Sequence, residues 1–323
     1  MEKIKQLQQD FAAFLAQTDF GGNPKELYEP IAYTILQSGK RLRPMLCLLA
    51  NDMFGGEERE ALWPALALET FHNFTLIHDD IMDKAPMRRG MPTVYQKWNA
   101  DIAILSGDAM LAKAFQYALQ PKKGADLAHL LGKVAIEICE GQQMDLNFET
   151  LGNVTIPEYL EMIRLKTAVL LATALQMGAT VTGADEDDIR HLYDFGINLG
   201  MSFQLQDDIL DLYSDVATFG KKHGGDIAEN KKTYLYLKAL ELASDKDRRR
   251  LEHLFTLRMD HDEEEKIEEV QALYDRLHVK EAVEKVMLDY DRRAFAELDA
   301  VGLPEEKKAH LRTYAELLSD RKK

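Results

Sequence analysis

The sequence predicts an all-α fold, and three observations support this prediction. Apolar residues recur at helical intervals through most of the 323 residues, most clearly over 100–119, 165–177 and 189–212. Sustained alternation of apolar and polar residues, the pattern of half-buried strands, is nearly absent. Prolines stand where apolar-periodic segments begin and glycines where they stop, which is the usual polarity of helices. We therefore expect a bundle of ten or more helices.

The expected helices follow these signals in chain order. Helix starts are expected at Pro24, Pro44, Pro64, Pro157 and Pro304, and helix ends at Gly124, Gly152 and Gly183. No Ser/Gly-rich linker, low-complexity run or repeat of fixed period divides the chain. We therefore expect a single domain over residues 1–323.

Composition excludes several classes of protein. The chain carries 55 acidic and 40 basic residues and a net charge of −15, so its surface should repel nucleic acid and anionic lipid. Residues 1–6 lack the apolar core of a signal peptide, and the most apolar stretch, 168–184, is broken by Gln176 and two glycines. We expect no membrane span. Cys47 and Cys139 lie in apolar stretches, so we expect both thiols to pack as small core residues and form no disulfide. Free thiols are typical of a reducing compartment, which favours a cytoplasmic protein.

One acidic cassette occurs twice, as Asp79-Asp80-Ile81-Met82-Asp83 (the first cassette) and Asp207-Asp208-Ile209-Leu210-Asp211 (the second cassette). On a helix, the first and last aspartates of a DDxxD cassette differ by about 40°, so the carboxylates gather on one face. Such anions repel one another unless hard cations lie between them, and Mg²⁺ prefers a few carboxylates combined with substrate phosphates. We therefore predict that the six aspartates hold several Mg²⁺ ions and one diphosphate.

The alternative to a metal site is a solvated acidic helix face, which is about as common for one cassette alone. Two copies favour the metal, because large apolar residues flank both cassettes, and clustered carboxylates on a buried side must be neutralised. An EF-hand calcium site is excluded, since neither cassette has the central glycine and distal glutamate of that loop.

Basic residues stand beside predicted turns near both cassettes. The segment Gly39-Lys40-Arg41-Leu42-Arg43-Pro44 places three cations at a helix break, where side chains and freed amides can converge on an anion. Arg88 and Arg89 follow the first cassette closely enough to reach a diphosphate held there. Glycine-rich residues 219–226 follow the second cassette and could close over a phosphate. The remaining candidate cations are Lys166, Lys221 and Lys231.

These motifs closely resemble those of the all-trans isoprenyl diphosphate synthases, also called polyprenyl synthetases. The landmarks run in the family's order over residues 39–233, whereas residues 234–323 are helical without a specific motif. The matching residues are Gly39 to Pro44, Leu76 to Asp83 with Arg88-Arg89-Gly90, Gly141-Gln142 with Asp145, Lys166-Thr167, Phe203-Gln204 with Gln206 to Asp211, and Gly220-Lys221 with Asp226 and Lys231.

The resemblance implies a single-domain helical bundle with a central cavity that condenses isopentenyl diphosphate head-to-tail with allylic diphosphates (dimethylallyl, geranyl or farnesyl). By this resemblance, Mg²⁺ would be held by Asp79, Asp80, Asp83, Asp207, Asp208 and Asp211. The allylic diphosphate would be bound by Arg88, Lys166, Lys221 and Lys231, and isopentenyl diphosphate by Lys40, Arg43, His72 and Arg89. Thr167 and Gln204 would line the reaction centre. The family is typically homodimeric.

Three other functions compete with this hypothesis. A class I terpene cyclase ionises the same diphosphates, but it would usually replace the second DDxxD and would not need Lys40, Arg43 and Arg89. A non-catalytic subunit of a heteromeric prenyltransferase would lose ligands, whereas this chain keeps all six aspartates. A helical scaffold protein would not bind diphosphate with Mg²⁺.

Product length is predicted from the residues that precede the first cassette. Thr75 lies one helical turn before Asp79 and Phe71 lies two turns before it, about 6 and 12 Å along the axis. A pocket beneath the cassette would meet a small residue first and bulky rings deeper. The resemblance adds that an aromatic residue at Phe74 followed by a small Thr75 is typical of enzymes that stop near C20, with C15 as the close alternative.

Overall fold

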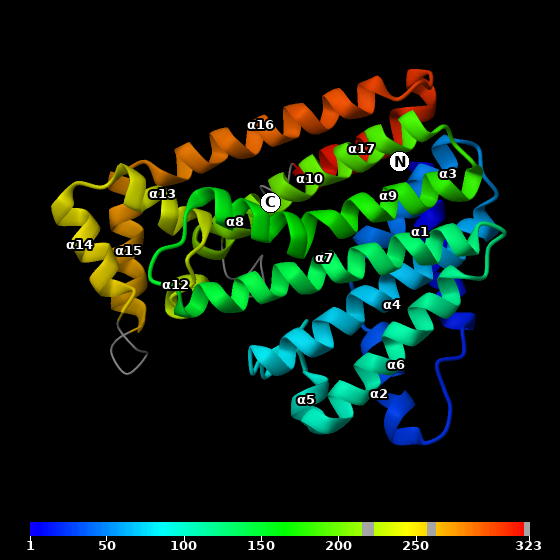
Figure 1. The fold of residues 1–323 in the computed structure, drawn as a ribbon, viewed down its shortest axis with the longest axis horizontal. Coiled ribbons are helices and arrows are strands. Elements are labelled where there is room, and N and C mark those ends of the chain that lie inside the picture. Colours follow the sequence, from blue (N-terminus) through cyan, green and yellow to red (C-terminus); the bar gives the residue numbers. More distant parts are fainter. Residues whose placement is uncertain (215–222, 257–262, 320–323) are drawn as a thin grey trace. The chain divides into compact units, whose positions relative to one another are not determined.

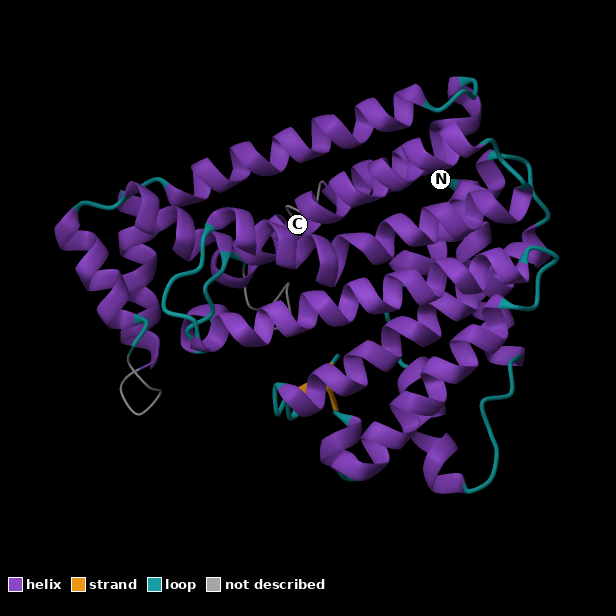
Figure 2. Cartoon of the chain, viewed as in Figure 1, coloured by secondary structure: helices purple, strands orange, loops and turns teal. Residues whose placement is uncertain are grey.

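The computed structural model describes residues 1–214, 223–256 and 263–319. Within them the chain is helical apart from one two-stranded hairpin, as Figures 1 and 2 show. In chain order the elements are α1 (Glu2–Gln17), α2 (Lys25–Ile35), α3 (Leu42–Met53), α4 (Glu58–Met82), β1 (Met87–Arg88), β2 (Met91–Pro92), α5 (Val94–Lys97), α6 (Ala100–Ala118), α7 (Gly124–Thr150), α8 (Ile156–Ile163), the π-helix η1 (Arg164–Ala168), α9 (Val169–Thr182), α10 (Glu186–Tyr213), α12 (Gly225–Ala228), α13 (Tyr234–Leu242), α14 (Asp245–Leu254), α15 (Glu263–Arg276), α16 (Val279–Ala300) and α17 (Glu305–Ser319). The predicted all-α class and the prediction of ten or more helices are confirmed.

Two of the predicted helix boundaries were wrong. Pro64 lies inside α4, because the helix already begins at Glu58 with Glu57 as its N-cap. Gly124 begins α7 instead of ending the preceding helix, which stops at Ala118. Gly152 and Gly183 do follow helix ends, and Gly183 has a φ of 73°, the left-handed conformation that glycine adopts at helix C-termini.

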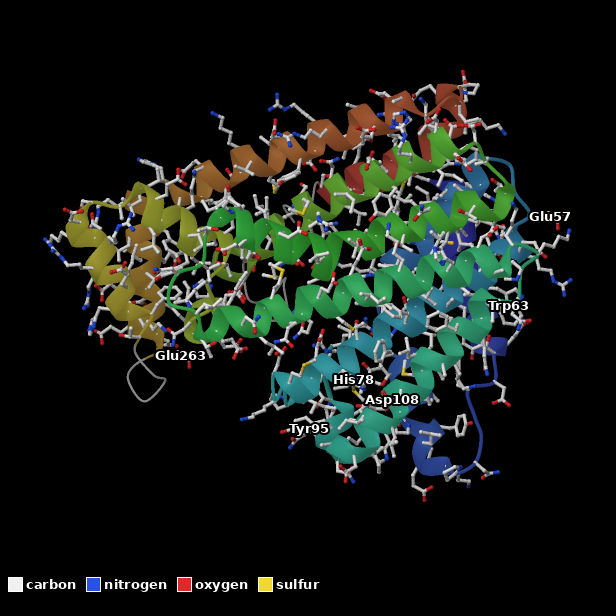
Figure 3. The ribbon with its side chains drawn as sticks, in the orientation of Figure 1. Glu57, Trp63, His78, Tyr95, Asp108 and Glu263 are labelled. Carbon is white, nitrogen blue, oxygen red and sulfur yellow. The ribbon has the colours of Figure 1, made fainter. Side chains whose placement is uncertain are left out.

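The chain forms two compact units, which are described separately. The first unit contains Met1–Ala135, Leu170–Tyr193 and Leu298–Ala315. Its core is organised by α4, which packs against α3 and α6. Small residues allow the close approach, since Ala61, Ala65 and Ala67 of α4 are fully buried. Near the start of α4, the ring of Trp63, which is labelled in Figure 3, stacks with its centroid 6.1 Å from that of Tyr117.

The second unit contains Ile136–Val169, Asp194–Glu297 and Glu316–Lys323. Its hydrophobic core draws buried side chains from α8, α10, α13, α15 and α16. α8 starts with a capping box, in which the Thr155 hydroxyl accepts from the Glu158 amide while the Glu158 carboxylate accepts from the Thr155 amide. The cap fixes where the helical run toward η1 begins.

In the part of the chain that the structure describes, one helical run is long and apolar enough to span a membrane by length and composition alone. It comprises Ile156–Thr182, and 67% of its most apolar window is buried inside the protein. A core helix passes the same test, so this run is weak evidence for a span.

Candidate active site

The first cassette lies at the carboxyl end of α4, in the first unit. Asp79 and Asp80 belong to the last turn of the helix and Asp83 is its C-cap. Asp80 is buried, and its Oδ1 accepts a hydrogen bond from Arg88 Nε over 2.7 Å. Burial raises the pKa of the Asp80 carboxyl, and the Arg88 guanidinium acts in the opposite direction. The middle aspartate is therefore engaged with protein, whereas Asp79 is half-buried and Asp83 is exposed.

A tight hairpin holds the two arginines that follow this cassette. β1 and β2 pair antiparallel, with Arg88 opposite Met91. The two turn residues, Arg89 and Gly90, have φ values of 53° and 75°, which is the sign pattern of a type I′ turn. The guanidinium of Arg89 reaches Gly39, where a Cβ would lie 3.3 Å from Arg89 Cζ. The predicted cation clusters around residues 39–44 and 88–89 are therefore brought together.

Arg41 joins this cluster through a partner that the sequence did not reveal. Its guanidinium pairs with the carboxylate of Glu69 and donates to the carbonyl oxygen of Ile35. Glu69 is 2% exposed and also accepts from Asn73 Nδ2 at 2.9 Å. Arg41 adopts a left-handed φ of 48° as the N-cap of α3, so this buried pair fixes the turn that carries the neighbouring cations.

His72 stands among these arginines. Burial lowers its pKa well below the ordinary value, and the charges of Arg43 and Arg89 lower it further. The imidazole is thus neutral at pH 7 and can donate one hydrogen bond without adding charge. Arg43 is half-buried, whereas Lys40 and Arg89 are exposed.

The residues predicted to set product length lie on α4, N-terminal to the first cassette. Phe71 is 1% exposed, and its ring centroid is 5.5 Å from that of the half-buried Phe74. The Thr75 hydroxyl donates to the His72 carbonyl oxygen at 2.8 Å. That bond occupies the hydroxyl proton of Thr75 within its own helix.

The second cassette lies near the carboxyl end of α10, in the second unit. Its middle aspartate, Asp208, is 3% exposed and accepts from Tyr159 Oη at 2.5 Å and from Gln204 Nε2 at 3.1 Å. Burial, and then the charge of Asp226, raise the pKa of the Asp208 carboxyl to about 8. Gln204 Oε1 in turn accepts from Thr167 Oγ1 at 3.0 Å. A hydrogen-bonded chain thus links Tyr159, Asp208, Gln204 and Thr167.

The Lys166-Thr167 pair lies in the π-helix η1. Glycines of two neighbouring helices meet this segment: a Cβ on Gly141 would lie 2.5 Å from Lys166 N, and one on Gly200 would lie 2.5 Å from Ala168 Cα. Lys166 Nζ donates to Asp145 Oδ2 at 2.6 Å. A π-helix commonly marks a functional site, and here it presents a cation and a hydroxyl in succession.

The remaining predicted residues of the second unit also have protein partners. Asp211 Oδ2 accepts from the Asp226 amide at 3.0 Å. Lys231 Nζ lies 2.8 Å from Glu229 Oε2 and 3.8 Å from Asp226 Oδ1. Lys221 lies outside the described residues.

The side chains of the cassettes suit a hard cation. All six carry carboxylate oxygens, the ligands that Mg²⁺ prefers, and in each cassette the middle aspartate is held by protein groups. Over residues 1–214, 223–256 and 263–319, no three His, Cys, Asp or Glu side chains converge tightly enough to hold a metal ion. The cassettes belong to different units, so their sharing of one metal–diphosphate cluster stays a prediction.

Sequence reasoning missed two residues of this site. Glu69 directly follows the apolar run Ala65-Leu66-Ala67-Leu68, and a charge at such a position implies a buried partner. The sequence gives no comparable signal for Tyr159, because an aromatic residue at an apolar helix position is usually an ordinary core residue. Its role is evident only from the hydrogen bond that its hydroxyl donates to Asp208.

Known proteins resemble this chain along most of its length. A family model described as polyprenyl synthetase matches residues 24–274. A short chain isoprenyl diphosphate synthase of Methanothermobacter thermautotrophicus is 39% identical over 281 residues, which are 86% of this chain and 85% of that protein. A crystal structure of a geranylgeranyl pyrophosphate synthase superposes with a TM-score of 0.94 at 41% identity, covering 99% of both chains. A polyprenyl synthase from Caulobacter crescentus CB15, complexed with calcium and isoprenyl diphosphate, gives a TM-score of 0.84 at 28% identity, covering 100% of this chain and 95% of that one.

Proposed function

The chain belongs to the polyprenyl synthetase family, and on this premise we propose its substrates, its metal and the roles of its residues. It is a trans-prenyltransferase of the short-chain type. It condenses isopentenyl diphosphate head-to-tail with dimethylallyl, geranyl or farnesyl diphosphate. The main product is the C20 diphosphate, with C15 as the alternative.

The allylic diphosphate is the leaving group, and cations must stabilise the charge that develops on it. We assign this role to Arg88, Lys166 and Lys231, together with Lys221 from outside the described residues. Each described cation lies against a carboxylate: Arg88 against Asp80, Lys166 against Asp145 and Lys231 against Glu229. These carboxylates keep the cations oriented before the diphosphate arrives.

The aspartates of the two cassettes would hold Mg²⁺ together with the diphosphate. When bound, the metal supplies positive charge to the departing diphosphate. We propose that all six aspartates contribute ligands, and that Arg88 and Tyr159 orient the middle ones, Asp80 and Asp208. The calcium and isoprenyl diphosphate bound by the Caulobacter protein support a divalent cation beside a diphosphate.

Isopentenyl diphosphate is proposed to bind without metal, at Lys40, Arg43, His72 and Arg89. The neutral imidazole of His72 would donate a hydrogen bond to a diphosphate oxygen while the three cations supply charge. Thr167 and Gln204 would line the reaction centre with oxygen dipoles facing the allylic cation. The proton that leaves after the new bond forms is taken by the released diphosphate, so no side-chain base is required.

The observation that supports this function best is the η1 segment with its partners. It places Lys166 against Asp145 and links Thr167 through Gln204 to the second cassette. A cation for the leaving group and a polar wall for the allylic cation thus arise from consecutive residues. A scaffold protein would have no need for this arrangement.

The test is a product assay with each allylic starter. Purified protein is incubated with isopentenyl diphosphate, one allylic diphosphate and Mg²⁺, and the products are identified by mass. Condensation that requires both substrates and Mg²⁺ supports the proposal. Products formed from an allylic diphosphate alone would identify a terpene cyclase, and no turnover with any starter would favour a non-catalytic subunit.

We also propose a homodimer in the cytoplasm. Exposed apolar residues on α6, Ile104 at 43% and Leu105 at 59%, support association with a second copy. Cys47 is buried as expected, whereas Cys139 is exposed, so the prediction that both thiols pack in the core was wrong for Cys139. Both thiols are free, which suits a reducing compartment. Light scattering after size-exclusion chromatography measures the oligomeric state, and a monomeric mass contradicts the dimer.

A further inference from the structure

His78 stands one residue before the first cassette and continues a row of rings along α4. Phe71, Phe74 and His78 lie on one side of the helix, because residues three and four positions apart share a row. The Phe74 ring is in the middle: its centroid is 5.5 Å from that of Phe71 and 4.9 Å from that of His78, in an edge-on arrangement. The His78 ring is therefore a direct neighbour of the Phe74 ring.

The His78 ring is fixed from the neighbouring helix α6. Its Nε2 lies 3.2 Å from the Ile104 carbonyl oxygen and 3.9 Å from Asp108 Oδ1. Figure 3 labels His78 and Asp108 on these two helices. A carbonyl oxygen only accepts, so the contact with Ile104 requires the proton on Nε2.

Gly107 provides the space that the ring occupies. A Cβ at this position would lie 2.3 Å from His78 Nε2 and 2.6 Å from Cδ2. Gly107 is buried inside α6 and is absent from the residues of positive φ, so backbone conformation does not demand glycine there. Glycine is required at position 107 by the close approach of the His78 ring to the α6 backbone.

We propose that His78, seated in the Gly107 notch, is a positioning residue for product length. It closes the space beside Phe74 and so keeps that ring where it stops chain growth. Phe74 lies five residues before Asp79, about 7 to 8 Å along the helix axis from the diphosphate end. The proposal rests on the proposed function, in which the chain grows from the first cassette along α4 and ends at Phe74.

The experiment compares product lengths of His78→Ala, Gly107→Ala and the double variant with wild type. His78→Ala opens space for Phe74 to turn aside, so the share of longer products rises several-fold. Gly107→Ala pushes the imidazole onto Phe74, so shorter products increase. Because the three atoms nearest to the added methyl all belong to the His78 ring, the double variant should match His78→Ala alone.

Two controls separate this effect from general damage. Gly132→Ala makes the same substitution where the new Cβ meets only Phe115 carbons at 3.8 Å or more, and its product ratio stays at wild type. His78→Asn, which removes the ring but keeps a polar side chain, gives the lengthening effect if the alanine variant is unstable.

Three outcomes overturn the proposal. An unchanged product ratio in His78→Ala and Gly107→Ala, while Phe74→Ala does change it, shows that His78 does not position Phe74. If the product ratio of Phe74→Ala is unchanged as well, Phe74 does not limit product length, and the proposal fails at that step. Absence of any condensation by the wild-type protein places the failure in the proposed function itself.

Discussion

Tyr159 donates a 2.5 Å hydrogen bond from its hydroxyl to Oδ2 of Asp208, 49 residues further along the chain. Both side chains are buried, at 4% and 3% exposure. The other oxygen of Asp208 accepts from Gln204, which accepts from Thr167. The middle residue of the second cassette is thus connected by side chains to the residue that follows Lys166.

Replacing Tyr159 by Phe should weaken both folding and catalysis. The variant leaves a buried carboxyl without one donor, a loss of about 1–3 kcal/mol in the free energy of unfolding. Chemical denaturation measures the loss, and steady-state kinetics should show a lower kcat with little change in either KM. Tyr234→Phe, on the ring that packs 6.3 Å from Tyr159, is the matched control. A wild-type kcat in Tyr159→Phe would show that the hydroxyl serves folding alone.

Stability of the metal-free protein should fall as pH rises from about 4 to about 8, because of Asp208. Its pKa is about 8 in the folded protein against an ordinary value of 3.8, so across this window the folded state keeps a proton that the unfolded state has lost. The contribution is fully present below pH 4 and is lost as pH rises through the folded pKa. Unfolding in a chelating buffer tests this against Asp208→Asn, whose stability relative to wild type should increase with pH. A constant difference across the window contradicts the buried proton.

Removing the first aspartate of either cassette should lower turnover strongly without unfolding the chain. Asp79→Ala and Asp207→Ala each delete a proposed metal ligand that matters most as charge develops, so kcat should fall by about 10²–10³-fold. Circular dichroism should retain the helical spectrum. Asp101→Ala, which replaces an exposed aspartate in the first turn of α6, serves as the control and should keep its activity. Near wild-type turnover in Asp207→Ala would identify the second cassette as a solvated face.

The two diphosphate sites should separate kinetically. Arg43→Ala should raise KM for isopentenyl diphosphate, and Lys166→Ala should raise KM for the allylic substrate. Each loses one charge-assisted hydrogen bond, worth about 1.5–3 kcal/mol, or about 10- to 100-fold. Equal changes of both constants in both variants contradict the assignment of separate sites.

Gly141→Ala should damage the reaction centre more than an ordinary helix substitution. Its methyl would lie 2.5 Å from the backbone nitrogen of Lys166, so η1 must move away from α7. We expect a lower melting temperature and a higher KM for the allylic diphosphate. Gly132→Ala on the same helix has room for its methyl and should be neutral or stabilising. Equal behaviour of the two variants contradicts a close η1–α7 contact.

Sequence patterns were sufficient for the helices and for the two cation clusters near the first cassette. The apolar-periodic segments 100–119 and 189–212 became α6 and α10 almost residue for residue, because helical periodicity is a local property. The segments around residues 40 and 88 were predicted as cation clusters from their composition alone. The hairpin then brought Arg89 to Gly39.

Long-range pairings were not predictable in the same way. Nothing near Tyr159 in the sequence specifies a partner 49 residues away, and the Glu69 carboxylate pairs with Arg41 only after α3 and α4 have packed. The prediction that a helix starts at Pro64 was wrong for a related reason. Tertiary packing sustains α4 through a residue that cannot donate a backbone hydrogen bond.

The π-helix at Arg164–Ala168 behaves as a one-residue insertion within a continuous helix. The surplus residue is absorbed in a widened turn, so everything after it is rotated by about 100° relative to an uninterrupted α-helix. Deleting any single residue of this turn would leave a regular helix of similar length. The same deletion would move the hydroxyl of Thr167 away from Gln204 or the ammonium of Lys166 away from Asp145. A one-residue deletion in this segment should therefore disrupt the reaction centre even when Lys166 and Thr167 are both kept.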